Sequence, residues 1–72
     1  SNAQQIRQRY SRLSRREREV MAWVVAGQSS KEIARLLDLS PRTVEAHRTH
    51  VMSKMGAANV AELVSMAAHC GD

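Results

Sequence analysis

The stretch KEIARLLDLSPRTVEAHRT, residues 31–49, decides the fold of this 72-residue chain. Ala34, Asp38 and Val44 fall within it at the spacing of a helix-turn-helix motif. Two helices that cross steeply through a tight turn need a small side chain where their axes approach, a residue that tolerates left-handed backbone at the bend, and an apolar side chain from the second helix. Asp38 stands where glycine is the commoner choice, but Asp tolerates positive φ better than most residues. The stretch therefore predicts a helix-turn-helix.

The second helix of this motif has the clearest start in the chain. Ser40 can cap the helix with its hydroxyl, and Pro41 follows at the first helical position, where an N–H is not needed. Gly56 is the next residue suited to ending a helix. The sequence therefore predicts a helix over about 41–55 that follows the tight turn directly.

Capping signals also delimit other helices. Ser14 with Glu17 three residues later is typical of a capping box, and Asn59 with Glu62 repeats this spacing near the C-terminus. The expected helices cover 4–12, 15–26, a segment from Ser29 or Ser30 to Leu37, 41–55 and 60–69. Their apolar residues at helical spacing before the turn are Ile6, Tyr10, Leu13, Val20, Met21, Trp23, Val24, Ile33, Ala34 and Leu37.

The composition agrees with packed helices. The chain holds one Trp, one Tyr and no Phe, so its core must be built from aliphatic residues and methionine, which suits helices better than a sheet. A chain of 72 residues allows one domain with one modest core. We expect an all-α fold, a compact four-helix bundle that contains the helix-turn-helix and can carry an extra N-terminal linker helix. The expected organisation is an expression-tag remnant over 1–3, an interdomain linker helix over 4–12 and the helix-turn-helix domain over 13–70.

The charge of the chain favours a polyanionic partner. Eleven Lys and Arg against seven Asp and Glu give a formal charge of +4. Six of the arginines lie between residues 7 and 18, and a solvated linker or helix face explains such a run equally well. Cys70 is the single cysteine, so no internal disulfide can form, which indicates a cytoplasmic location. No apolar stretch approaches the roughly 18 residues that a membrane-spanning helix needs, and we expect no membrane partner.

The helix over 41–55 has an apolar face and a polar face. Val44, Val51 and Met55 share the apolar face. The opposite face is short-chained and polar with flanking cations, which suits the major groove of DNA because bulky apolar groups would block entry. An ordinary solvated surface has the same pattern, and the adjacent turn motif favours the DNA interpretation. We expect contacts with base edges from Arg42, Glu45, Ala46 and Thr49.

Contacts with phosphates are expected from helix ends and from cations beside this face. Arg48 lies nearer the core side, where its guanidinium reaches either a phosphate or water. His47 borders the core, and a hydrogen-bonded structural role suits it better than base recognition. Glu45 repels phosphates unless it faces bases or pairs with a neighbouring arginine. The residues expected near the DNA backbone are Ser30, Lys31, Thr43, His47, Arg48, His50 and Lys54.

The helix over 60–69 carries more apolar surface than one docking face requires. Its polar strip is narrow and consists of Glu62, Ser65 and His69. The surplus suggests a second contact, either with a symmetric partner or with a missing domain, although small alanines also favour helix formation by themselves. We expect a homodimer interface at Val60, Val64 and Ala68.

Over about 13–67 the sequence resembles the C-terminal effector domain of the LuxR/NarL class of bacterial transcription regulators, most closely the FixJ-like response regulators. The resemblance rests on LSRREREVM at 13–21, KEIA at 31–34 and above all SPRTVEAHR at 40–48. It implies a four-helix domain, DNA recognition by the third helix, dimerisation through the fourth, and a phosphorylatable receiver domain upstream. It also implies base contacts at Glu45, Ala46 and Thr49, and backbone contacts at Lys31, Thr43, His47 and Lys54.

The expected function is sequence-specific binding of duplex DNA by the effector domain of a bacterial response regulator, as a dimer, with helix 41–55 in the major groove. RNA polymerase is a further candidate partner. Two alternatives stay open: a polymerase-recruiting module resembling region 4 of sigma factors, and a helical bundle that binds a protein and ignores nucleic acid. The sequence shows no paired carboxylates or activated nucleophile, and its three histidines are scattered. We therefore expect no enzyme activity, no catalytic residue, no metal and no cofactor.

Overall fold

The computed structural model describes residues 2–70 of the chain, and these residues form helices without any strand. The helices are α1 (Asn2–Ser11), α2 (Arg15–Val25), α3 (Ser30–Leu37), α4 (Pro41–Met55) and α5 (Val60–Ala67). The expected all-α fold is therefore confirmed, with four helices forming the bundle and α1 as the additional N-terminal helix.

The four helices of the bundle each begin at a polar side chain that accepts a hydrogen bond from the backbone of the first turn. The caps are Ser14, Ser29, Ser40 and Asn59. Such a cap contributes typically about 1 kcal/mol because it satisfies a backbone N–H that has no partner within the helix. In α2 the reciprocal bond of the capping box is also present. In α5 the Glu62 carboxylate accepts instead from the backbone N–H of Ala58, at 3.1 Å.

The tight turn between α3 and α4 has the geometry that the sequence predicted. Asp38 ends α3 in the left-handed region, with φ 56° and ψ 49°. The backbone N–H of Leu39 donates to the carbonyl of Ala34 at 2.8 Å, which closes the end of α3. Gly56 ends α4 in the same region, with φ 71°. Both residues therefore stop their helices by adopting a backbone conformation that most side chains disfavour.

Four predicted helix limits differ from the observed ones. α2 ends at Val25, one residue early, because Ala26 serves as its C-terminal cap. α5 ends at Ala67 rather than near residue 69, because the backbone N–H groups of His69 and Cys70 donate to carbonyls three residues back, a tighter turn than an α-helix makes. α1 begins at Asn2 rather than Gln4 and ends at Ser11 rather than at residue 12. Residue 1 of the expected tag remnant lies outside the described residues.

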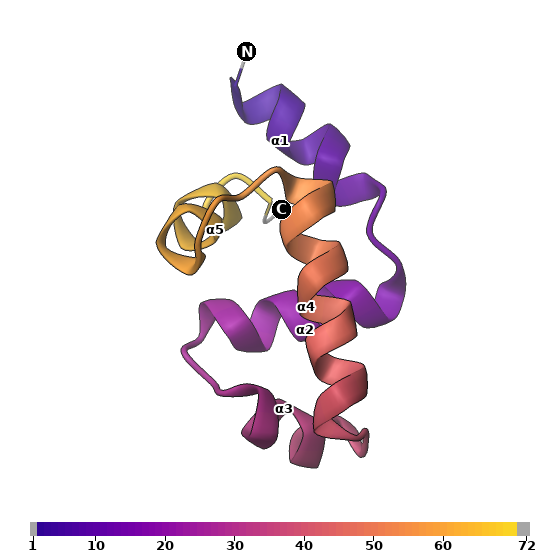
Figure 1. Cartoon of the computed structure of the whole chain (residues 1–72). Helices are drawn as coiled ribbons and strands as arrows, with labels where there is room; N and C mark the ends of the chain where they lie inside the picture. The colour runs from indigo at the N-terminus through magenta and orange to yellow at the C-terminus, as the bar shows by residue number, and fades with distance from the viewer. Residues whose placement is uncertain (1, 71–72) are drawn as a thin grey trace.

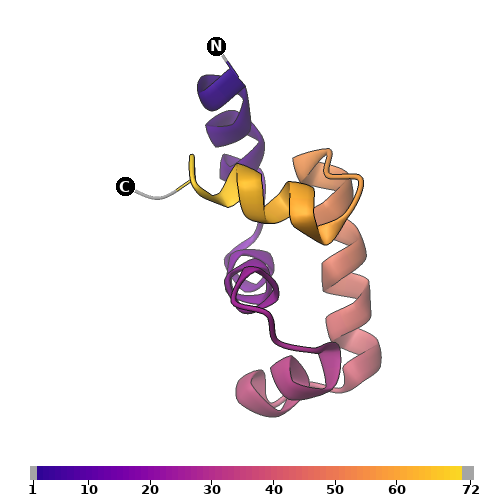
Figure 2. The same ribbon diagram turned by 90° about the vertical axis from the view of Figure 1, so that its left-hand side faces the viewer.

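α4 is the longest helix, and the other helices pack around it (Figure 1). α3 lies at its N-terminal end, α2 crosses its middle, and α1 approaches its C-terminal end. Figure 2 shows α5 crossing above α2 on the side away from α3. The tight turn, α3 and the start of α4 thus lie at one end of the molecule, whereas α1, α5 and the C-terminal end of α4 lie toward the other.

The core lies where α2, α3, α4 and α5 meet. Burying an aliphatic side chain of this size contributes roughly 1.5–3 kcal/mol, so burial of Val44, Val51 and Met55 holds the apolar face of α4 against the other helices. Trp23 is half-buried and packs against the core. The buried apolar residues are Leu13, Val20, Met21, Val24, Ile33, Ala34, Val44, Val51, Met55 and Leu63.

The arginines near the N-terminus do more than form a solvated face, because two of them hold α1 against the bundle. Arg9 donates from Nη1 to the carbonyl of Met55 at 3.3 Å, where the last carbonyls of α4 need donors. Arg18 places its guanidinium 4.8 Å from the centre of the Tyr10 ring and donates to the carbonyl of Ser11 at 3.3 Å. These contacts make α1 part of the folded unit.

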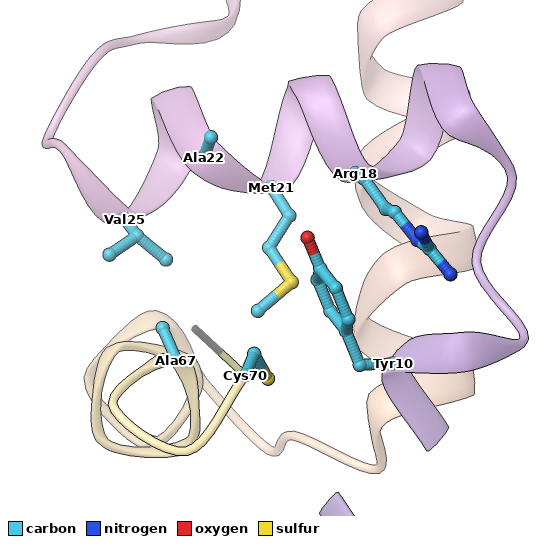
Figure 3. A pocket seen from close by; sticks show the side chains of 7 residues that line it. All are labelled: Tyr10, Arg18, Met21, Ala22, Val25, Ala67 and Cys70. Atoms are coloured by element: carbon cyan, nitrogen blue, oxygen red, sulfur yellow. The ribbon is translucent and has the colours of Figure 1, made fainter. Parts of the chain in front are cut away.

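A cleft of about 310 Å³ lies between α1, α2 and α5. Figure 3 shows the Tyr10 ring beside the guanidinium of Arg18, with Met21 reaching into the space between α2 and α5. Cys70 is free, and partial burial raises the pKa of its thiol, which makes it a weak nucleophile. The cleft is lined by Tyr10, Arg18, Met21, Ala22, Val25, Ala67 and Cys70.

None of the described helices is long and apolar enough to cross a membrane.

Candidate nucleic-acid interface

The two faces of α4 lie as the helical wheel predicted. Val44 and Val51 are buried, whereas Arg42, Ala46 and Thr49 are exposed. Thr49 donates its hydroxyl to the carbonyl of Glu45 at 3.0 Å, so its hydroxyl hydrogen is already used within the helix. The exposed face therefore presents short side chains and one arginine to solvent.

Glu45 is the acidic residue on this face, and two neighbours hold its carboxylate. The hydroxyl of Ser30 on α3 donates to its Oε2. The Nε of Arg48 lies 3.6 Å from the same oxygen. Because the Glu45 side chain remains 63% exposed, it is held in place and is still accessible. Arg48, whose guanidinium was expected to reach either a phosphate or water, therefore offsets the negative charge of Glu45.

The N-terminal end of α4 lies at the tight turn, and the first turn of α3 lies beside the second turn of α4, where Ser30 contacts Glu45. Lys31 is exposed in the first turn of α3, and no acidic side chain among residues 2–70 pairs with it. Thr43 is exposed in the first turn of α4, and its hydroxyl accepts from the hydroxyl of Ser40 at 2.9 Å. Helix N-termini attract anions because unpaired N–H groups and the helix dipole both point outward there. This end of the molecule can therefore receive phosphates.

Lys54 and His50, two other residues expected near phosphates, face Glu17 on α2. The Lys54 ammonium lies 2.8 Å from Oε1 of Glu17, and Nδ1 of His50 lies 3.6 Å from Oε2. Glu17 is buried, with 5% of its surface exposed. The hydrogen bond from Lys54, followed by that from the backbone N–H of Ser14, lowers the pKa of Glu17 in spite of burial. The carboxylate is therefore charged at neutral pH and joins α2 to α4.

His47 differs from its expected role. Its side chain is half-buried, but its Nδ1 is buried and has no hydrogen-bond partner. The expectation of a hydrogen-bonded structural histidine is therefore wrong for this nitrogen. No donor or acceptor of the described residues lies in hydrogen-bonding position beside this nitrogen.

Sequence reasoning missed the second role of Glu17. It identified this residue as the partner in a capping box, which the structure confirms. The ion pair with Lys54 joins residues separated by 37 positions, and no local pattern marks such a pair. One sequence signal indicated this role: Glu17 lies on the same face of the helix as the core residues Val20 and Met21, where a carboxylate is unusual.

α5 exposes part of its apolar surface. Leu63 is buried, whereas Val60 and Val64 are 40% and 43% exposed. Ala68, which caps α5, is also exposed. The three residues expected at a dimer interface are thus accessible on one short helix.

Comparison with known proteins identifies relatives of the chain. Residues 11–67 match the family of bacterial regulatory proteins described as the luxR family. The chain is 54% identical over 66 residues to the transcriptional regulatory protein FixJ of Rhizobium meliloti, covering 92% of this chain and 32% of that protein. It is 47% identical over 55 residues to the oxygen regulatory protein NreC of Staphylococcus aureus, covering 76% and 25%.

A solved structure has the same fold. Crystallised full-length FixJ from B. japonicum superposes with a TM-score of 0.85 at 50% sequence identity, covering 97% of this chain and 34% of that one. The chain therefore spans about a third of the length of these relatives.

Proposed function

Because the chain belongs to the LuxR family of bacterial regulatory proteins, whose helix-turn-helix domains act in transcription regulation, we propose that it binds duplex DNA sequence-specifically as the effector domain of a response regulator. The observation that carries the proposal is the exposed, short-chained face of α4, beside the N-terminal ends of α3 and α4. Such a helix fits the major groove, which is about 12 Å wide.

The base contacts in this proposal come from Arg42, Glu45, Ala46 and Thr49. A guanidinium pairs best with the two acceptors of guanine, and a carboxylate accepts from the amino group of cytosine. The methyl groups of Ala46 and Thr49 suit the methyl group of thymine. The contacts of Glu45 with Ser30 and Arg48 support its role, because a carboxylate that is already oriented loses less freedom on binding.

The phosphate contacts divide into two groups. Lys31 and Thr43 are exposed at helix N-termini and supply direct contacts. The remaining residues contact the DNA backbone with side chains that already interact with Glu45 or lie beside Glu17. Each of them therefore contributes less to DNA affinity on its own. This second group consists of Ser30, Arg48, His47, His50 and Lys54.

Dimerisation on DNA is proposed through α5. Val60, Val64 and Ala68 present exposed apolar surface, and a symmetric pair of such helices buries each surface against the other. In the whole protein, residues 4–12 link the domain over 13–70 to an upstream receiver domain. RNA polymerase is a further proposed partner of the complete regulator.

Fluorescence anisotropy of labelled duplexes tests the proposal. We expect the chain to bind a random duplex with an affinity that falls linearly in log salt, with a slope matching a handful of phosphates. Selection from a random pool then yields a preferred site with tighter binding. A sigma-like module would need polymerase for specific binding, and a pure protein-interaction bundle would bind no duplex at any salt concentration, even after fusion to a dimerising segment.

A further inference from the structure

Three metal-ligating side chains from two helices meet at the crossing of α2 and α4. Glu17 comes from α2, and His47 and His50 come from α4. Each offers one ligand atom, and these atoms all lie within 4.8 Å of one another. Residues three apart on a helix lie on neighbouring parts of its surface, so both imidazoles can reach the same carboxylate. We propose that these three residues form a binding site for Zn²⁺.

The Glu17 carboxylate is oriented for binding a metal through one oxygen. Its Oε1 accepts from the backbone N–H of Ser14 and from the Lys54 ammonium, both at 2.8 Å. Its Oε2 faces His50 at 3.6 Å. Metal sites commonly hold a ligating group in place through hydrogen bonds to its other atoms. Lys54 can therefore stay on Oε1 while the ion binds Oε2.

His47 supplies an independent indication. Its Nδ1 is buried and makes no hydrogen bond. Buried polar atoms in folded proteins nearly always have a partner, and an ion is one of the groups that can satisfy such an atom. Neutral imidazole is a good ligand for Zn²⁺.

The donor set and its geometry favour zinc over harder cations. Two imidazoles with one carboxylate form open zinc sites in which water takes the fourth position, whereas Mg²⁺ and Ca²⁺ prefer oxygen ligands. Tetrahedral coordination at about 2.0–2.1 Å places ligand atoms roughly 3.3 Å apart. The His50 side chain is 61% exposed, so it can turn toward Oε2 and close the remaining distance. A bound ion would then join α4 to α2.

Calorimetric titration of the chain with ZnCl₂ at pH 7.5 tests the proposal. We expect one equivalent to bind, and His50→Gln to weaken that binding at least about tenfold. His69→Gln is the matched control, because it removes an exposed histidine just after α5, and it should leave the affinity unchanged. Cys70→Ser serves as a second control for thiolate binding. Circular dichroism checks that every variant is folded.

Titration with Co²⁺ gives a second readout, because its visible spectrum reports coordination by nitrogen and oxygen. His47→Gln and His50→Gln should both abolish the tetrahedral spectrum. The proposal is overturned if the wild-type chain binds no Zn²⁺ at millimolar concentration, or if His50→Gln binds as tightly as the wild type. It is equally overturned if His69→Gln or Cys70→Ser removes the binding.

Discussion

The ammonium of Lys54 on α4 lies 2.8 Å from the buried carboxylate of Glu17 on α2. The same carboxylate caps the first turn of α2. One side chain therefore completes the start of α2 and joins that helix to the C-terminal half of the helix that we propose enters the major groove.

Removing the charge of Glu17 should lower the free energy of unfolding. Glu17→Gln keeps an acceptor for Ser14 but leaves Lys54 without its anion, and we expect a loss of about 1–3 kcal/mol at pH 7 in urea unfolding. The pKa of Glu17 is lowered in the folded chain. Its stabilisation is therefore complete above the ordinary value of 4.5 and is lost as the pH falls through the lowered folded value. The difference in unfolding free energy between the wild type and Glu17→Gln should shrink over that pH range.

Glu19→Gln is the control, because Glu19 is exposed and paired with Arg16. A difference between the wild type and Glu17→Gln that does not depend on pH would contradict this account.

Asp38 offers a test of the backbone at the tight turn. Its φ of 56° places it in the left-handed region, and its side chain is exposed. Asp38→Gly should raise the unfolding free energy by about 0.5 kcal/mol, because relief of the steric cost slightly exceeds the added entropy of the unfolded chain. Asp38→Ala should lower it by about 1 kcal/mol. Urea unfolding of both variants checks this, and the opposite order of stability would show that the Asp side chain itself stabilises the turn.

The same substitution, valine to alanine, at Val51 and at Val64 distinguishes a core position from the proposed dimer surface. Val51→Ala deletes buried methyl groups and should cost about 2–3 kcal/mol. Val64→Ala, on α5, should change stability by less than about 0.5 kcal/mol while weakening dimer formation on DNA. Thermal unfolding and analytical ultracentrifugation with a selected duplex measure the two effects. Undiminished dimerisation by Val64→Ala would argue against α5 as the interface.

Lys31 and Thr49 test the division between backbone and base contacts. Lys31→Ala should weaken binding to selected and random duplexes alike and reduce the salt slope by about one phosphate. Thr49→Ala should alter sequence preference at one position, by about 1 kcal/mol, because it removes one methyl contact, with little change on random DNA. Anisotropy on both duplexes at several salt concentrations measures this. Equal losses for both variants on both duplexes would remove these assignments.

Glu45→Gln should change which base is preferred. The carboxylate suits the amino group of cytosine, whereas an amide pairs with the two groups of adenine. We expect selection from a random pool to exchange cytosine for adenine at one position. Ser30→Ala, which removes a hydrogen bond to the same carboxylate, should keep the preference and reduce affinity. An unchanged preference for Glu45→Gln would place this residue outside the base-contacting set.

Features that depend on neighbouring residues were predictable. Ser40, Pro41 and Gly56 delimit α4 because capping and backbone conformation act within one turn of a helix. The left-handed backbone of Asp38 followed from the spacing of the turn motif. The end of α5 was less predictable, because several tight hydrogen-bonding patterns compete at a helix terminus.

The sequence by itself determined the helices, the apolar face of α4 and the membership of the family, since each depends on periodicity and local spacing. Only the tertiary structure decided that Arg9 reaches the end of α4 and that Glu17 meets Lys54, His47 and His50. The physical reason is that such contacts depend on how the helices cross, and packing of the whole core sets those crossings.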